Sequence, residues 1–134
     1  MDISALESAL PGATVDALAA VTSSSEAYVS ADRSRVGQSS VEAWWRLVGI
    51  SSAGARLGRN HVEAEYELMI RQAGATDSQL GVMAEEIRSA FHGAKNPPGV
   101  ARHLKTEVSD LEYLGDSETD RAVLVTVTFM GQEE

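Results

Sequence analysis

The chain has 134 residues, a formal net charge of −9 at pH 7 and no cysteine. This length predicts one domain spanning residues 1–134, and the missing cysteine excludes disulfides, thiolate metal sites and cysteine nucleophiles. Because the neutralisation of phosphates dominates nucleic-acid affinity, the negative charge argues against general nucleic-acid binding. No run reaches the roughly 18 apolar residues that a membrane helix needs, and the acidic residues 1–10 do not resemble a secretion signal.

The first forty residues predict short helices followed by irregular chain. Residues 3–10 carry apolar side chains at helical spacing, and Pro11-Gly12 is expected to end this helix. Thr14 is a suitable N-cap for a second short helix that continues to residue 21. Residues 27–29 predict the start of a strand, and residues 33–40 predict an exposed loop.

The middle of the chain predicts two strands joined by a loop. Residues 41–50, VEAWWRLVGI, are rich in β-branched and aromatic side chains, which is typical of a strand. Residues 51–60, SSAGARLGRN, have the glycines and serines of a loop and no period. Residues 61–71 alternate by twos, which predicts a long strand with one buried face. The alternation sends one set inward, namely Val62, Ala64, Tyr66, Leu68 and Ile70, and the glutamates Glu63, Glu65 and Glu67 outward.

The next segment predicts a helix over residues 77–91. Thr76 and Gln79 have the spacing of a capping box, and Gly93 stands where a helix C-cap belongs. Apolar side chains recur on one side of this helix, at Leu80, Met83, Ala84, Ile87 and Phe91. This stripe is expected to pack on the buried face of the preceding strand.

The last part predicts two more strands. Residues 100–108 are expected to place Val100, Leu104 and Val108 on one face, with a bulge near Asp110. Residues 122–130 alternate again, with Val123, Val125, Val127 and Phe129 on one face and Leu124, Thr126, Thr128 and Met130 on the other. The order of elements predicts an α+β fold with an antiparallel or mixed sheet of four to five strands, a helix across one face and short N-terminal helices. Residues 1–40 form the helical and irregular part of this prediction, and residues 41–134 form its core.

No set of residues predicts catalysis, a metal or a cofactor. The three histidines, at positions 61, 92 and 103, are not spaced as metal ligands. The outward glutamates lie about 7 Å apart along the strand, but no apolar pocket that would suit paired catalytic carboxylates is visible beside them. The glycines of residues 51–60 do not form a phosphate-binding loop, which also needs a lysine before serine or threonine. The sequence therefore predicts a protein that is not an enzyme.

The charge is unevenly placed along the chain. Residues 33–61 carry five arginines against one glutamate, whereas residues 1–32 and 62–134 are both acidic. Two interpretations stay open: a solvated surface without a partner, or charge complementarity between copies or with another protein.

Five stretches, in order, carry a family resemblance: AWWRLVGI, AGARLGR, HVEAEYELMIRQ, SQLGVMAEEIRSAFHG and RAVLVTVTFMG. They read as a tryptophan-bearing strand, a loop with glycine and arginine, a long alternating strand, a helix and a closing strand. With this order, residues 41–130 resemble the tail terminator proteins of long-tailed bacteriophages, also called tail completion or tail-to-head joining proteins.

The resemblance implies a virion protein, assembled in the host cytoplasm, that forms a ring, usually a hexamer, on the end of the tail tube. The implied partners are further copies of the chain, the tail tube protein and the head or neck connector protein, while DNA passes through without specific binding. A ring needs two different complementary surfaces per copy, and an acidic lining would let DNA slide. The outward glutamates or the acids near the carboxy terminus are the candidates for that lining. The candidate interface residues are Arg33, Arg35, Arg56, Arg59, Glu63, Glu65 and Glu67.

Three other functions remain as alternatives. One is a head-completion or connector protein of the phage neck, which is also a ring. The second is a small non-catalytic protein-binding adaptor. The third is an enzyme with a shallow acidic site.

Overall fold

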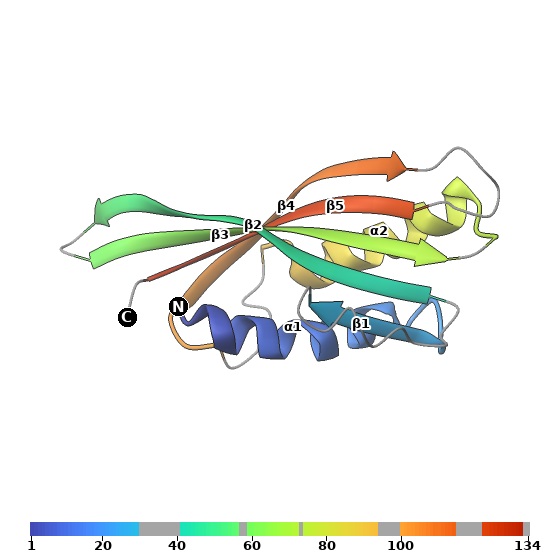
Figure 1. Cartoon of the computed structure of the whole chain (residues 1–134), viewed down its shortest axis with the longest axis horizontal. Helices are drawn as coiled ribbons and strands as arrows, with labels where there is room; N and C mark the ends of the chain where they lie inside the picture. Colours follow the sequence, from blue (N-terminus) through green and yellow to red (C-terminus); the bar gives the residue numbers. More distant parts are fainter. Residues whose placement is uncertain (30–40, 57–58, 73, 94–99, 115–121, 133–134) are drawn as a thin grey trace.

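The computed structural model describes residues 1–29, 41–56, 59–72, 74–93, 100–114 and 122–132, without the side chains of 53–56 and 59–60. Two helices and five strands follow one another along this part of the chain (Figure 1). Their bounds are α1 (Ile3–Leu18), β1 (Ser25–Val29), β2 (Val41–Arg56), β3 (Arg59–Gln72), α2 (Asp77–Phe91), β4 (His103–Leu114) and β5 (Ala122–Gln132).

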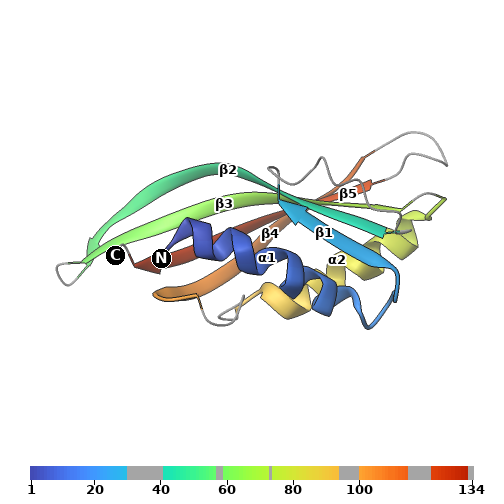
Figure 2. The same cartoon turned by 60° about the horizontal axis from the view of Figure 1, so that its bottom comes forward.

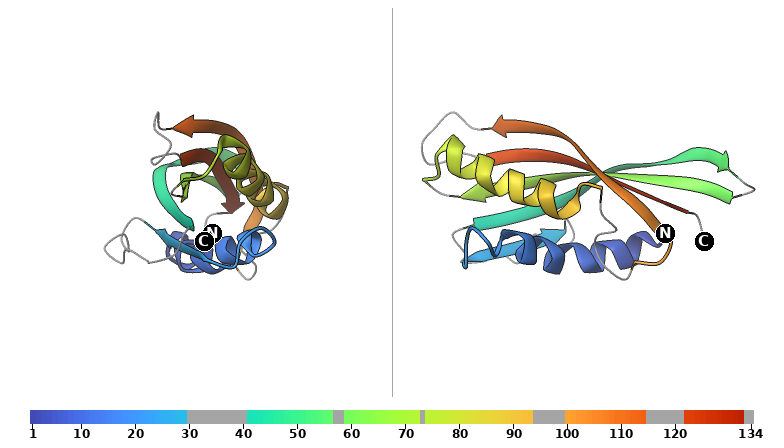
Figure 3. Two further views of the ribbon diagram at one scale, coloured as in Figure 1. Left: turned by 90° about the vertical axis from the view of Figure 1, so that its right-hand side faces the viewer. Right: turned by 180° about the vertical axis from the view of Figure 1, so that it is seen from behind.

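The five strands form one sheet in the order β1-β2-β3-β5-β4. β1 runs parallel to β2, and the other neighbours are antiparallel. Both helices pack on the same side of the twisted sheet (Figures 2 and 3). The predicted α+β class with a mixed sheet and a helix across one face is therefore confirmed.

The N-terminal region forms one helix, so the prediction of two short helices is wrong. Pro11 lies inside α1, and Thr14 is an interior residue rather than a cap. Proline removes one backbone hydrogen bond from a helix, but packing here outweighs that loss. α1 buries a stripe of side chains spaced by four positions against the sheet, namely Leu6, Leu10, Thr14 and Leu18.

The core is organised around Trp45. Its side chain is fully buried, and its ring lies 6.0 Å from Tyr66, 5.5 Å from Phe91 and 5.9 Å from Phe129, measured between centroids. The indole Nε1–H donates to Thr14 Oγ1 at 2.8 Å, and that hydroxyl donates to the carbonyl of Leu10 at 2.7 Å. Trp45 therefore connects both helices to the sheet with its polar atom satisfied.

The segment predicted as a loop at residues 51–60 is largely strand, so that prediction is wrong. β2 and β3 stay paired to their ends, where Ala55 is opposite Asn60 and Arg56 is opposite Arg59. Backbone hydrogen bonds hold this pairing and do not need apolar side chains. We call residues 51–56 and 59–62 the arm, because they extend beyond both helices (Figure 1).

Helix α2 begins and ends as predicted. The Thr76 hydroxyl accepts from the backbone of Gln79, and the Gln79 side chain accepts from the backbone of Thr76, which completes the capping box. Gly93 has a φ of +74°, a conformation that glycine adopts without strain. The Gly93 N–H donates to the carbonyl of Thr106 at 2.8 Å, so the end of the helix is tied to β4.

β4 begins later than predicted, and its predicted face is only partly correct, because Val100 and Val108 pack against the core but Leu104 does not. The register shifts between His103 and Lys105, and Leu104 is 40 % exposed. The buried positions are instead His103 and Thr106, whose Nε2 and Oγ1 atoms lie 2.8 Å apart. The predicted bulge near Asp110 is confirmed, because the register shifts again between Val108 and Leu111.

Because of the buried Tyr66 hydroxyl, we expect the free energy of unfolding to decrease at alkaline pH. Burial, together with the charge of Glu7 and the hydrogen bond to its Oε1 at 3.0 Å, raises the pKa of Tyr66 well above its usual range. The unfolded chain therefore loses this proton near pH 10 while the folded chain keeps it. Above that pH the free energy of unfolding should fall by roughly 1.4 kcal/mol per pH unit more than in a Tyr66→Phe variant.

Urea denaturation between pH 9 and 11 measures this difference. Tyr113→Phe is the control, because Tyr113 is 48 % exposed. Equal pH slopes for the wild type and Tyr66→Phe would contradict the assignment.

Candidate functional site

The sheet has one face covered by the helices and one that α1 and α2 leave free. Along β3 the side chains of Ala64, Tyr66 and Leu68 are buried in the core. Alternation sends the neighbouring residues to the opposite face, which we call the open face. The open face carries Trp44 and Arg46 from β2, Glu63, Glu65, Glu67 and Met69 from β3, and Leu124, Thr126 and Thr128 from β5.

One end of the open face holds an apolar hollow. Trp44 is paired with Met69, and Met69 is paired with Leu124, so three large side chains meet across neighbouring strands. The hollow has a volume of about 330 Å³ and is lined by Trp44, Arg46, Glu67, Met69, Leu114 and Leu124. This apolar hollow suits a large aliphatic or aromatic side chain of a partner.

An ion pair stands at the rim of the apolar hollow. Arg46 Nη2 lies 2.8 Å from Glu67 Oε2, and the two side chains are 64 % and 29 % exposed. A pair this exposed stabilises the fold by about 0–1 kcal/mol at most. Its effect is to orient two charges beside an apolar surface.

The other two predicted glutamates lie nearer the arm. Glu63 and Glu65 line a hollow of about 250 Å³ with Gly49, Ile50, Ser51 and Thr128. Among the described residues, neither carboxylate makes a hydrogen bond or an ion pair. The surroundings mix polar and apolar surface and are open to water, so these charges are suited to meeting a cationic partner.

Of the four predicted arginines, the structure describes only the backbone of Arg56 and Arg59. Arg56 and Arg59 are paired with each other at the end of the arm, and their side chains lie outside the described part. Arg33 and Arg35 also lie outside the described residues. The structure therefore places Glu63, Glu65 and Glu67 together on the open face, as predicted, and two arginines at the end of β2 and the start of β3.

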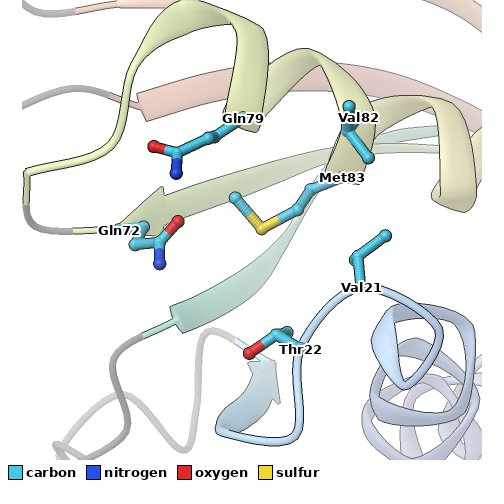
Figure 4. Close-up of a pocket in the computed structure, with 6 residues that line it drawn as sticks. All are labelled: Val21, Thr22, Gln72, Gln79, Val82 and Met83. Carbon is cyan, nitrogen blue, oxygen red and sulfur yellow. The ribbon is translucent and has the colours of Figure 1, made fainter.

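A third hollow lies between the turn after α1 and the first turns of α2 (Figure 4). Its volume is about 300 Å³, and it is lined by Val21, Thr22, Gln72, Gln79, Val82 and Met83. Val21 and Val82 are 39 % and 49 % exposed. The described residues of its lining include no charged side chain, so they can bind an apolar or amide group but supply no acid or base.

His92 and His103, which lie beside and within β4, make hydrogen bonds that stabilise the fold. His103 contacts Thr106, and His92 Nδ1 accepts from the backbone N–H of Val108 at 3.0 Å. Within the described ranges, no group of three histidine, aspartate or glutamate side chains is placed to hold a metal ion. None of the helices seen in these ranges is both long and apolar enough to span a membrane.

Comparison with models of known protein families finds no match, and comparison with curated proteins finds none either.

The apolar hollow was not predicted from the sequence. Its signal was present in the strand alternation, because Trp44, Met69 and Leu124 occupy positions that alternate with core residues. Apolar residues on both faces of a strand indicate that both faces have contacts. The sequence does not show that these three positions would be adjacent, because this requires the pairing of β2, β3 and β5.

Proposed function

We propose that the chain is a structural assembly protein of a phage tail, which forms a ring that caps the tail tube and joins it to the head or neck. The observation that carries the proposal is the pair of unlike surfaces on one small fold. One surface is the open face, with its apolar hollow and its glutamates. The other is the arm, whose sequence holds two arginines and no acid.

Two unlike surfaces suit head-to-tail contacts between identical copies. Such contacts close into a ring when the rotation between copies allows it. The tail-terminator resemblance of residues 41–130 supplies the place of that ring, at the end of the tube. In this proposal the protein acts by shape and charge without making or breaking bonds, and DNA passes through the ring without specific binding.

The test of the ring first looks for a tail tube gene next to the gene for this chain, and then uses the tube protein that such a gene encodes. Purified tubes are mixed with the chain and imaged by electron microscopy. Rings at one end of the tubes, with tubes that stop growing, would support the proposal. Binding to a purified head connector but not to tubes would favour a neck protein, and binding to neither would refute both.

The arginines of the arm give a further prediction. Replacing Arg56 and Arg59 with glutamate should weaken ring assembly about tenfold or more, which corresponds to about 1.4 kcal/mol, because two attractive charges become repulsive. The fold should survive, because Arg56 and Arg59 are opposite each other at the end of the arm, beyond the strand pairs that carry the core. Sedimentation measures assembly, and circular dichroism measures folding.

Arg88→Glu on α2 is the control for this variant, because Arg88 is 55 % exposed and belongs to neither proposed surface. Loss of the circular dichroism signal in R56E/R59E would mean that the arm is part of the core. Unchanged assembly would remove the arm from the interface.

A further inference from the structure

We infer that the open face of one copy receives the arm of a second copy of this chain. This inference rests on the proposed function and deepens it, because it names the two surfaces that meet between neighbouring copies. Three features carry it: the apolar hollow, the exposed apolar residues at the base of the arm, and the opposite charges of the two surfaces.

The open face has the properties of a protein contact rather than of a channel wall. Its hollow of about 330 Å³ is lined by the half-buried side chains of Trp44, Met69 and Leu124. A hollow with apolar walls can receive a large apolar side chain of a partner, as the central pockets of protein interfaces do. A channel that lets DNA slide needs charge but gains nothing from an apolar hollow.

The base of the arm offers exposed apolar side chains to a partner. Val48 and Ile50, at its base, are 46 % and 53 % exposed although both are large and apolar. Among the described residues β5 accompanies β3 as far as His61, so the end of the arm is described as two paired strands without a third. An isolated two-stranded hairpin is marginally stable in water, and contact with another surface would stabilise it.

Charge selects the open face as the surface that covers the arm. Residues 51–62 contain Arg56 and Arg59 and no acid. The open face carries three glutamates, of which Glu67 pairs with Arg46 while Glu63 and Glu65 have no partner among the described residues. Opposite charges on two surfaces guide their encounter and fix their orientation.

The arm cannot fold over the open face of its own copy, because it is a continuation of the paired strands that carry this face. Arg59 and Glu63 are separated by about 13 Å along β3, and Arg59 and Glu65 by about 20 Å, given the rise of a strand. β3 is paired with β2 along the arm and with β5 from His61 to Arg71, so the arm continues the sheet and does not lie on it. The contact is therefore between copies, and because the arm and the open face are different surfaces it repeats head to tail.

Charge reversal tests the contact. Glu63→Arg with Glu65→Arg should reduce self-association about tenfold or more in sedimentation experiments, and so should R56E/R59E. Combining all four substitutions in one chain should restore association, because each contact then has opposite charges again. The control is Asp16→Arg with Glu85→Arg, which changes the net charge equally at exposed positions on the helices.

Cross-linking tests whether the arm of one copy contacts the open face of another. The chain has no native cysteine, so only the introduced cysteines react with the cross-linker. Copies with Ser52→Cys on the arm are mixed with copies carrying Thr126→Cys on the open face, and a short bis-maleimide is added. Linked dimers should form in the mixture and not with either variant alone. Equal linking of Ser52→Cys copies with each other would show a symmetric arm-to-arm contact and overturn the inference.

The outcomes separate this inference from the proposed function. A chain that stays monomeric at millimolar concentration, or E63R/E65R copies that form normal rings on tail tubes, would overturn the inference and leave the tube-capping function standing. Conversely, rings that form through arm and open face but ignore both tubes and connectors would refute the function and support the inference.

Discussion

Replacing Trp45 with alanine is expected to destabilise the fold by about 3–5 kcal/mol. The side chain has no exposed surface and contacts the rings of Tyr66, Phe91 and Phe129. Its removal leaves a cavity between the sheet and both helices, and it leaves the hydroxyl of Thr14 without its donor. Because domains are stable by only about 5–15 kcal/mol, urea denaturation should show a much lower midpoint.

Two variants separate the causes of this loss. Trp45→Phe keeps an aromatic ring and removes the donor to Thr14, so its loss should be smaller. Trp44→Ala removes a tryptophan from the open face, where it is only half-buried, and should also cost less. Equal destabilisation by Trp44→Ala and Trp45→Ala would contradict the assignment of the two faces.

Shortening Ile87 or Val125 to alanine should each cost about 2–4 kcal/mol. Ile87 is fully buried on the inner side of α2, and Val125 is 1 % exposed on β5. Both changes remove methyl groups from the layer between helix and sheet. Thermal or urea unfolding measures the loss, and circular dichroism confirms that the native helix is retained.

Exposed valines provide matched controls for these substitutions. Val82 lies on α2 and is 49 % exposed, and Val48 lies on β2 and is 46 % exposed. Val82→Ala and Val48→Ala should change the free energy of unfolding by less than about 0.5 kcal/mol, as surface changes usually do. A large loss from Val82→Ala would mean that this side of α2 is covered.

The parts of the fold that the sequence predicts well have a regular period. β3 and β5 alternate by twos, and α2 combines a three-and-four spacing with its Thr76 capping box. In each case the local pattern agrees with the final packing, so the local pattern is enough to predict the element. The open-face position of Glu63, Glu65 and Glu67 follows from the same alternation.

The mistaken predictions arise where contacts distant in sequence outweigh local signals. Pro11 is a strong stop signal, but burial of Leu10 and the hydrogen bonds of Thr14 keep α1 continuous. The serines and glycines of residues 51–60 indicate a loop, but pairing between β2 and β3 continues through most of them. The apolar hollow is lined by residues of four strands, β2, β3, β4 and β5, so it can be recognised only once the order of the strands in the sheet is known.

The end of α2 also limits aggregation through the edge of the sheet. β4 is an edge strand, and edge strands of neighbouring molecules can join into continuous sheets that aggregate. Here the carbonyl of Thr106 and the N–H of Val108 are already bonded to Gly93 and to the ring of His92. A strand of another molecule would have to break both hydrogen bonds before it could pair with β4 here. These bonds therefore oppose aggregation by sheet extension at Thr106 and Val108, even at high protein concentration.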